Sequence, residues 1–74
     1  MTTKDLLNSF DVSSRSKRRR AAAFAIDLLD LIRAAEEAYM DRVPENLRAG
    51  DAFANAELSL DAIADAIAGL ADAY

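Results

Sequence analysis

The chain has a single proline, Pro44, and the stretches on either side of it contain almost nothing that interrupts a helix. Residues 15–43 lack both glycine and proline, and residues 51–73 contain only one glycine, Gly69. Because glycine and proline are the residues that most destabilise helix interiors, both stretches can form long helices. Pro44 restricts the residue before it and lacks a backbone donor, so the first helix should end there. The pattern predicts an all-α fold.

We expect one domain over residues 1–74, because so short a chain cannot form two hydrophobic cores. Residues 1–14 are predicted to form an N-terminal arm with a short helix, 15–42 a long helix, 43–50 a loop and 51–73 a second long helix. Residues suited to begin a helix precede each one, namely Thr2 and Thr3, then Asp11, Ser13 and Ser14, then Gly50 and Asp51. Two long helices joined by a short loop make an antiparallel hairpin.

Apolar residues recur every three or four positions in the second long helix, at Phe53, Ala56, Leu60, Ile63, Ile67, Leu70 and Tyr74. This alternation is typical of a seam along which one helix packs on another. The first long helix has two such series, one at Phe24, Leu28, Leu31, Ala35 and Ala38, the other at Ile26, Leu29, Ile32, Glu36 and Tyr39. The combined stripe is wider than a single neighbouring helix can cover.

Two segments could cover the rest of this stripe: the arm, with Leu6, Leu7 and Phe10, or a second copy of the chain. We favour a homodimer that forms a four-helix bundle, because a short chain gains stability by association. The residues expected in the core or in oligomer contacts are Phe24, Leu28, Leu31, Phe53, Leu60, Ile63, Ile67 and Leu70.

The chain has no cysteine and no histidine. It therefore has no disulfide framework and no thiol nucleophile, and it lacks the commonest zinc and acid–base residue. Carboxylate pairs such as Asp27 with Asp30 do not have the accompanying histidine of a bundle metal site, and Asp30 is spaced to pair with Arg33. We expect no catalytic, cofactor or metal site, and hence a protein that is not an enzyme.

The longest apolar stretch, residues 21–26, is far shorter than the roughly 20 residues of a membrane span. Residues 1–10 are polar and are followed, not preceded, by basic residues, unlike a signal peptide. No membrane association is expected, and the predicted location is the cytoplasm.

The net charge of −4 conceals an uneven distribution. Residues 1–20 hold six basic and two acidic side chains, whereas residues 21–74 hold three arginines and eleven acids. Cations in the first turn of a helix oppose its dipole, so an anionic group should face them. The basic cluster consists of Arg15, Lys17, Arg18, Arg19 and Arg20. It could bind nucleic acid, a nucleotide, a membrane surface or an acidic helix, or it could simply be a solvated surface or an internal ion network, the simpler interpretation.

An acidic ridge is predicted on the second long helix, made of Glu57, Asp61, Asp65 and Asp72. Like charges four residues apart repel, so the ridge also favours a cationic neighbour. It could complement the basic cluster, imitate nucleic-acid phosphates or dock on a basic protein surface. A solubilising helix face is the simpler interpretation.

The loop and the second helix carry a family resemblance over residues 36–73. The matching residues are the turn Val43-Pro44-Glu45-Asn46-Leu47, then Ala56-Glu57, Leu60-Asp61-Ala62-Ile63 and Ala66-Ile67. They resemble an uncharacterised group of short acidic helical proteins of phages and other mobile elements. The resemblance implies a phage or prophage accessory protein that acts in the cytoplasm of a bacterial host cell, and no particular activity. In the turn itself, Leu47 is expected to plug the open end of the hairpin, while Glu45 and Asn46 cap backbone groups.

Three functions follow as hypotheses. The first is a non-enzymatic interaction protein that binds a protein partner through its charged faces, most concretely an inhibitor of a bacterial defence system, like the small anti-CRISPR proteins. The second is a helical oligomer that binds nucleic acid or a nucleotide through the basic cluster. The third is an antidote-like partner of a toxin.

Overall fold

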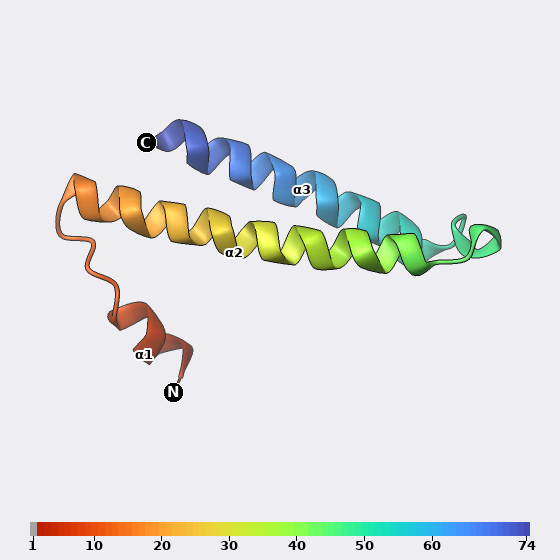
Figure 1. Ribbon diagram of the computed structural model, residues 1–74, viewed down its shortest axis with the longest axis horizontal. Coiled ribbons are helices and arrows are strands. Elements are labelled where there is room, and N and C mark those ends of the chain that lie inside the picture. Colours follow the sequence, from red (N-terminus) through yellow and green to blue (C-terminus); the bar gives the residue numbers. More distant parts are fainter. Residues whose placement is uncertain (1) are drawn as a thin grey trace.

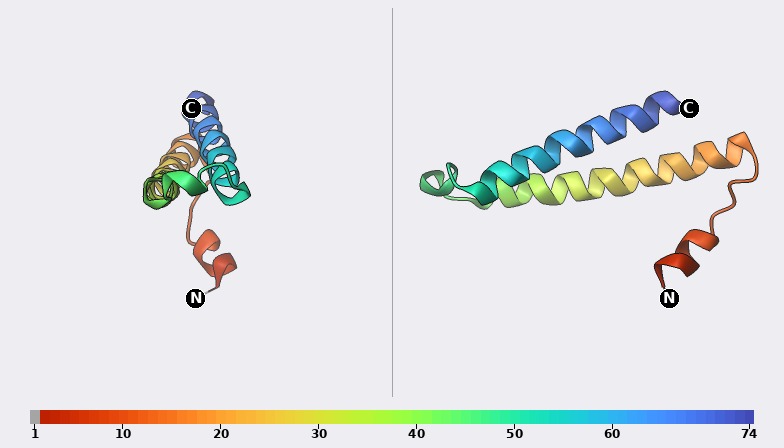
Figure 2. Two further views of the ribbon diagram at one scale, coloured as in Figure 1. Left: turned by 90° about the vertical axis from the view of Figure 1, so that its right-hand side faces the viewer. Right: turned by 180° about the vertical axis from the view of Figure 1, so that it is seen from behind.

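A computed structural model describes residues 2–74, which form three α-helices and one short 3-10 turn. The elements are α1 (Thr3–Asn8), α2 (Arg15–Arg42), η1 (Glu45–Leu47) and α3 (Asp51–Ala73). α2 and α3 run antiparallel to each other on either side of η1, and α1 lies on the opposite side of α2 from α3 (Figures 1 and 2). The predicted all-α fold and its antiparallel hairpin are confirmed.

Local hydrogen bonds explain where the helices begin and end. The Thr2 hydroxyl accepts a bond from the Asp5 amide, and the Asp5 carboxylate accepts one from the Thr2 amide, each at 3.2 Å. This reciprocal pair forms a capping box at the start of α1. The Ser14 hydroxyl caps α2 by accepting the Lys17 amide at 3.1 Å. α2 stops before Pro44, where Val43 is extended.

The predicted apolar series of α3 lies along the seam with α2. Phe53, Leu60, Ile63, Ile67 and Leu70 are half-buried there, and Ala56 is buried, with 3% of its surface exposed. The face of α2 that joins this seam consists of residues spaced by four and three, namely Ala22, Ile26, Leu29, Arg33, Glu36 and Met40, all half-buried. The seam thus follows the alternating spacing of a coiled coil.

The hairpin is open and elongated. α2 and α3 are closest beside η1 and diverge toward the other end (Figure 1). The molecule measures 51 × 31 × 15 Å, and its radius of gyration is 15.9 Å. A compact domain of this length would have a radius of gyration of about 11 Å. Ala56 is the single buried residue within 2–74, so the described part of the chain has no closed core.

Arg48, and not Leu47, closes the loop end of the hairpin. Leu47 is 57% exposed, so the prediction that it plugs this end is wrong for the single chain. The Arg48 side chain donates to the Val43 carbonyl at 3.2 Å and lies 5.7 Å from the Phe53 ring centroid. Backbone bonds hold the turn itself, including one from the Leu47 amide to the Pro44 carbonyl at 2.9 Å.

Candidate interaction surfaces

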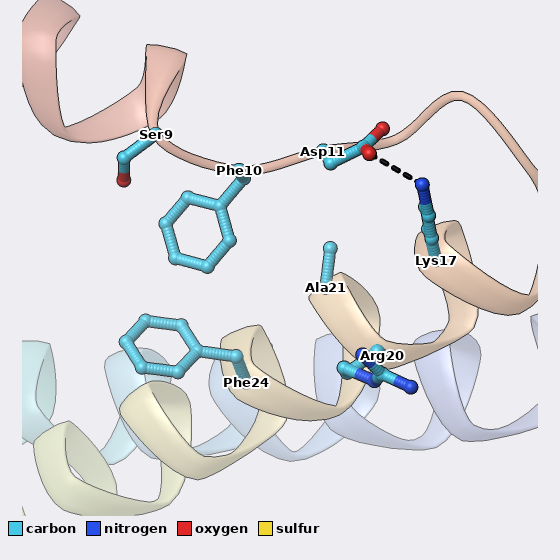
Figure 3. A pocket seen from close by; sticks show the side chains of 7 residues that line it. All are labelled: Ser9, Phe10, Asp11, Lys17, Arg20, Ala21 and Phe24. Carbon is cyan, nitrogen blue, oxygen red and sulfur yellow. Dashed lines mark hydrogen bonds and ion pairs between the residues drawn. The ribbon is translucent and has the colours of Figure 1, made fainter.

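The arm folds back onto the first turns of α2. The rings of Phe10 and Phe24 face each other with centroids 5.1 Å apart, a favourable aromatic distance (Figure 3). Beside them, the Asp11 carboxylate accepts a hydrogen bond from the Lys17 ammonium at 2.6 Å. An open hollow of about 430 Å³ lies between these contacts, with Arg20 at its edge. The arm therefore covers part of α2, as one of the two expected arrangements requires.

Asp11 is the electrostatic centre of this junction. One of its carboxylate oxygens accepts the Lys17 ammonium and the other accepts the Ser13 amide at 3.0 Å. The Lys17 bond, followed by the Ser13 bonds, lowers the pKa of Asp11 from 3.8 to about 2. A carboxylate at this place also offsets the positive end of the α2 dipole. Asp11 thus supplies part of the anionic compensation that the basic cluster needs.

Contacts within the chain engage three of the five side chains in the basic cluster. Lys17 bonds Asp11, Arg18 donates to the Val12 carbonyl at 3.1 Å, and the Arg15 guanidinium lies 5.1 Å from the Tyr74 ring centroid. Arg19 and Arg20 form no side-chain hydrogen bond or ion pair with any residue in 2–74. These two arginines are the part of the cluster that remains available.

The acidic ridge is exposed along its whole length, since Glu57, Asp61, Asp65 and Asp72 all lie off the seam. Of the ion pairs found across residues 2–74, none includes a ridge carboxylate. The ridge and the basic cluster are therefore not joined to each other within one described chain. Each still requires counterions or a partner of opposite charge.

Arg33 pairs with two of the carboxylates of α2, Asp30 and Glu37. Its guanidinium bonds Asp30 at 3.1 and 3.2 Å and Glu37 at 3.0 Å, which confirms the predicted Asp30–Arg33 pair. The hydrogen bond with Asp30, followed by that with Glu37, raises the pKa of Arg33. In the described chain no three carboxylates gather into a group suited to hold a metal ion.

A broad apolar surface remains on α2. Phe24, Leu28 and Leu31 are 53%, 50% and 67% exposed, so they lie outside the hairpin seam, and Phe10 of the arm packs on Phe24. Leu6 and Leu7 of the arm are also largely exposed and line, with Phe24 and Leu28, a groove of about 340 Å³. The series from Phe24 to Ala38 thus faces solvent beyond the arm. Of the second predicted series, Ile26, Leu29 and Glu36 lie on the α3 side, whereas Ile32 and Tyr39 are 45% and 38% exposed.

The contact of Phe10 with Phe24 is the cover by the arm that the sequence offered as one of two alternatives. Two other contacts escaped prediction: Arg15 with Tyr74, and Arg48 with Val43 and Phe53. Each joins residues from different elements, and only the isolated aromatic rings in the sequence could have hinted at them.

No helix within residues 2–74 has the length and hydropathy to cross a bilayer. Comparison of the chain with protein-family models, curated proteins and solved structures finds no match.

Proposed function

We propose that this chain is a non-enzymatic interaction protein that binds a protein partner through the exposed charged faces of its helices. Its most concrete form is an inhibitor of a bacterial defence system, anti-CRISPR-like, that a phage or mobile element encodes and that acts in the host cytoplasm. The resemblance at the Pro44–Leu47 turn supports this setting. The working unit is a homodimer in which two hairpins form a four-helix bundle.

The acidic ridge is the observation that carries this proposal. Glu57, Asp61 and Asp65 follow one another at four-residue intervals, so the carboxylates rise along α3 in steps of about 6 Å. Neighbouring like charges at this spacing cost about 0.2–0.5 kcal/mol per pair. A basic surface on a partner protein would remove this repulsion and add Coulomb attraction, which favours rapid and selective binding.

Capture from a bacterial lysate tests this proposal with a matched pair of variants. The ridge variant is Asp61→Asn/Asp65→Asn, and the control is Asp27→Asn/Glu45→Gln, which removes the same charge from exposed carboxylates outside the ridge. We expect the unmodified chain and the control to retain one stoichiometric protein. The ridge variant should retain at least about tenfold less, because it loses two charge contacts with the partner.

Salt dependence adds a second readout to the same experiment. Retention by the unmodified chain should fall as the salt concentration rises from about 50 to about 300 mM, since exposed charge contacts are screened over these distances. Equal retention by the two double variants would indicate a solubilising ridge and would contradict the proposal, as would the absence of any stoichiometric protein.

Nucleic-acid binding is the second candidate, and the unpaired side chains of Arg19 and Arg20 favour it. Arginine matches phosphate geometry, and each phosphate contact adds to the salt dependence of binding. With labelled duplex DNA or RNA, Arg19→Ala/Arg20→Ala should weaken binding and reduce the log–log salt slope by about two. Lys4→Ala/Arg42→Ala removes the same charge elsewhere and should leave both unchanged. Equal effects of the two variants would argue against this candidate.

A further inference from the structure

We propose that the outer face of α2 is the contact surface for a second copy of this chain, and that the two α2 helices meet there antiparallel, with Leu28 of each opposite Leu31 of the other. The outer face is the exposed series Phe24, Leu28, Leu31, Ala35 and Ala38. The inference rests on the proposed association of two copies and specifies its surface and orientation. Because the outer face lies on the side of α2 away from α3, the two α2 helices meet in the middle and the two α3 helices lie outside them, in place of a closed four-helix bundle.

The chain exposes more surface than a compact monomer of its mass, and the excess is about the area that one copy buries in a dimer. A compact monomer of 8.0 kDa exposes about 4,450 Å², whereas this chain exposes 5,702 Å². The excess of about 1,250 Å² matches what one subunit contributes to a stable dimer, about 800 Å² in a standard interface and more in an obligate one. A hairpin with one buried residue thus has the surface that a second copy would cover.

The outer face is self-complementary when it is reversed. The spacings of four, three and four between Phe24, Leu28, Leu31 and Ala35 are symmetric about the midpoint between Leu28 and Leu31. In an antiparallel pair, Phe24 of one copy therefore lies opposite Ala35 of the other, and a large side chain meets a small one. A closed dimer with twofold symmetry requires this reciprocal matching.

The arm contributes to the same surface. Phe10 fixes it over the N-terminal half of α2, while Leu6 and Leu7 remain 49% and 63% exposed. Antiparallel pairing brings this arm alongside the C-terminal half of the second α2, where Leu31 and Ala35 have no cover from their own chain. Each arm then extends the apolar contact to the second copy, which covers the groove between the arm and its own helix.

Charge selects the antiparallel orientation. α2 begins with the basic cluster and ends with the carboxylates Glu36, Glu37 and Asp41 beside a single Arg42. Antiparallel pairing places the basic start of one helix near the more acidic end of the other, whereas parallel pairing would set the two basic clusters side by side. Association through the far side of α3 would bring two acidic ridges together and is disfavoured for the same reason.

The absence of cysteine makes the orientation measurable, because a single Ser16→Cys substitution gives one spin label per chain. Antiparallel pairing centred between Leu28 and Leu31 separates the two labels by about 40 Å, from 27 residues of helix at 1.5 Å each. Pulsed electron resonance on the full chain should record this distance. A separation below about 20 Å would indicate parallel pairing and overturn the inference.

Two leucines of equal exposure provide matched variants for the surface. Leu31 on the outer face and Leu58 on α3 are both 67% exposed, so neither contributes appreciably to its own hairpin. Leu31→Glu should weaken dimerisation roughly 100-fold, since two copies lose a buried leucine at the interface. Leu58→Glu should leave it unchanged. Sedimentation velocity measures both, and circular dichroism verifies that helix content is retained.

The outcomes separate this inference from partner binding through the acidic ridge. A folded chain that sediments as a monomer, or a dimer that Leu31→Glu leaves intact, overturns the inference whether or not a partner protein is captured. A dimer with the 40 Å label separation supports it, even if the ridge variant and its control capture equally and the partner-binding proposal fails.

Discussion

The ring of Phe10 packs against the ring of Phe24 at a centroid distance of 5.1 Å and an angle of 53°, and this contact joins the arm to α2. Tilted aromatic pairs at such distances are favourable beyond the area that they bury. Apart from it, the side-chain ion pair of Asp11 with Lys17 and the bond from Arg18 to Val12 hold the arm. The arm is therefore the part of the monomer that should open most readily.

Phe10→Ala should release the arm and leave the α2–α3 hairpin intact. Loss of the aromatic pair and of its apolar burial should cost about 1–2 kcal/mol of arm docking. Amide hydrogen exchange at low concentration, where the monomer dominates, should lose protection in α1 and keep it in the seam. Leu47→Ala removes a side chain of similar polarity from the loop and should change neither. Continued protection of α1 in the Phe10 variant would contradict this role.

The docked arm should respond to acid through Asp11. Its pKa is about 2 in the folded chain and 3.8 in the reference state, so the folded chain binds this proton less readily. The carboxylate therefore stabilises docking fully above about pH 4, and this contribution is lost as the pH falls through about 2. NMR contacts between Phe10 and Phe24 should weaken across that window. Asp11→Asn should weaken them at all pH values and remove that dependence; an unchanged profile would exclude Asp11 as the cause.

The seam has least room at Ala56, which is 3% exposed near the closed end of the hairpin. Ala56→Leu should force α2 and α3 apart and lower the free energy of unfolding by about 1–3 kcal/mol. Ala62→Leu introduces the same side chain at an exposed position of α3 and should be nearly neutral. Chemical unfolding followed by circular dichroism measures both. Equal stability of the two variants would mean that the helices do not pack closely at Ala56.

Arg48 should stabilise the loop end of the hairpin although it is exposed. Arg48→Ala removes the bond to the Val43 carbonyl and the contact with the Phe53 ring, which together should cost about 1 kcal/mol. Arg42→Ala serves as the control, because Arg42 forms no ion pair with any residue in the described range. Thermal unfolding should show a lower Tm for the Arg48 variant alone. A similar Tm for both would contradict the role of Arg48 in closing the turn.

The helices and their pairing could be predicted because local chemistry and periodicity agree along the chain. Pro44 ends α2, Ser14 and Thr2 begin helices, and the series from Phe53 to Leu70 faces α2. For α2 the sequence offered two apolar series and no means of choosing between them. The half-buried face includes Arg33 and Met40 where the second series has Ile32 and Tyr39, a shift that hydrophobic periodicity alone would not select.

The sequence predicted which residues form the candidate surfaces, but not which contacts these residues make. Counting charges located the basic cluster, yet which of its members are engaged depends on where the arm folds, as Lys17 with Asp11 and Arg15 with Tyr74 illustrate. Leu47 and Arg48 show the same limit, since the sequence does not determine which of two adjacent loop side chains packs against the hairpin. Such choices depend on tertiary geometry that a linear pattern does not contain.

Light scattering of the unmodified chain over a range of concentrations tests most directly whether a second copy covers the outer face of α2. The account predicts a particle of about 16 kDa, two copies of the 8.0 kDa chain, that dissociates on dilution together with a loss of helix signal. A well-folded helical particle of one chain mass at every concentration would contradict it, because the monomer would then be stable with Leu28 and Leu31 exposed to solvent.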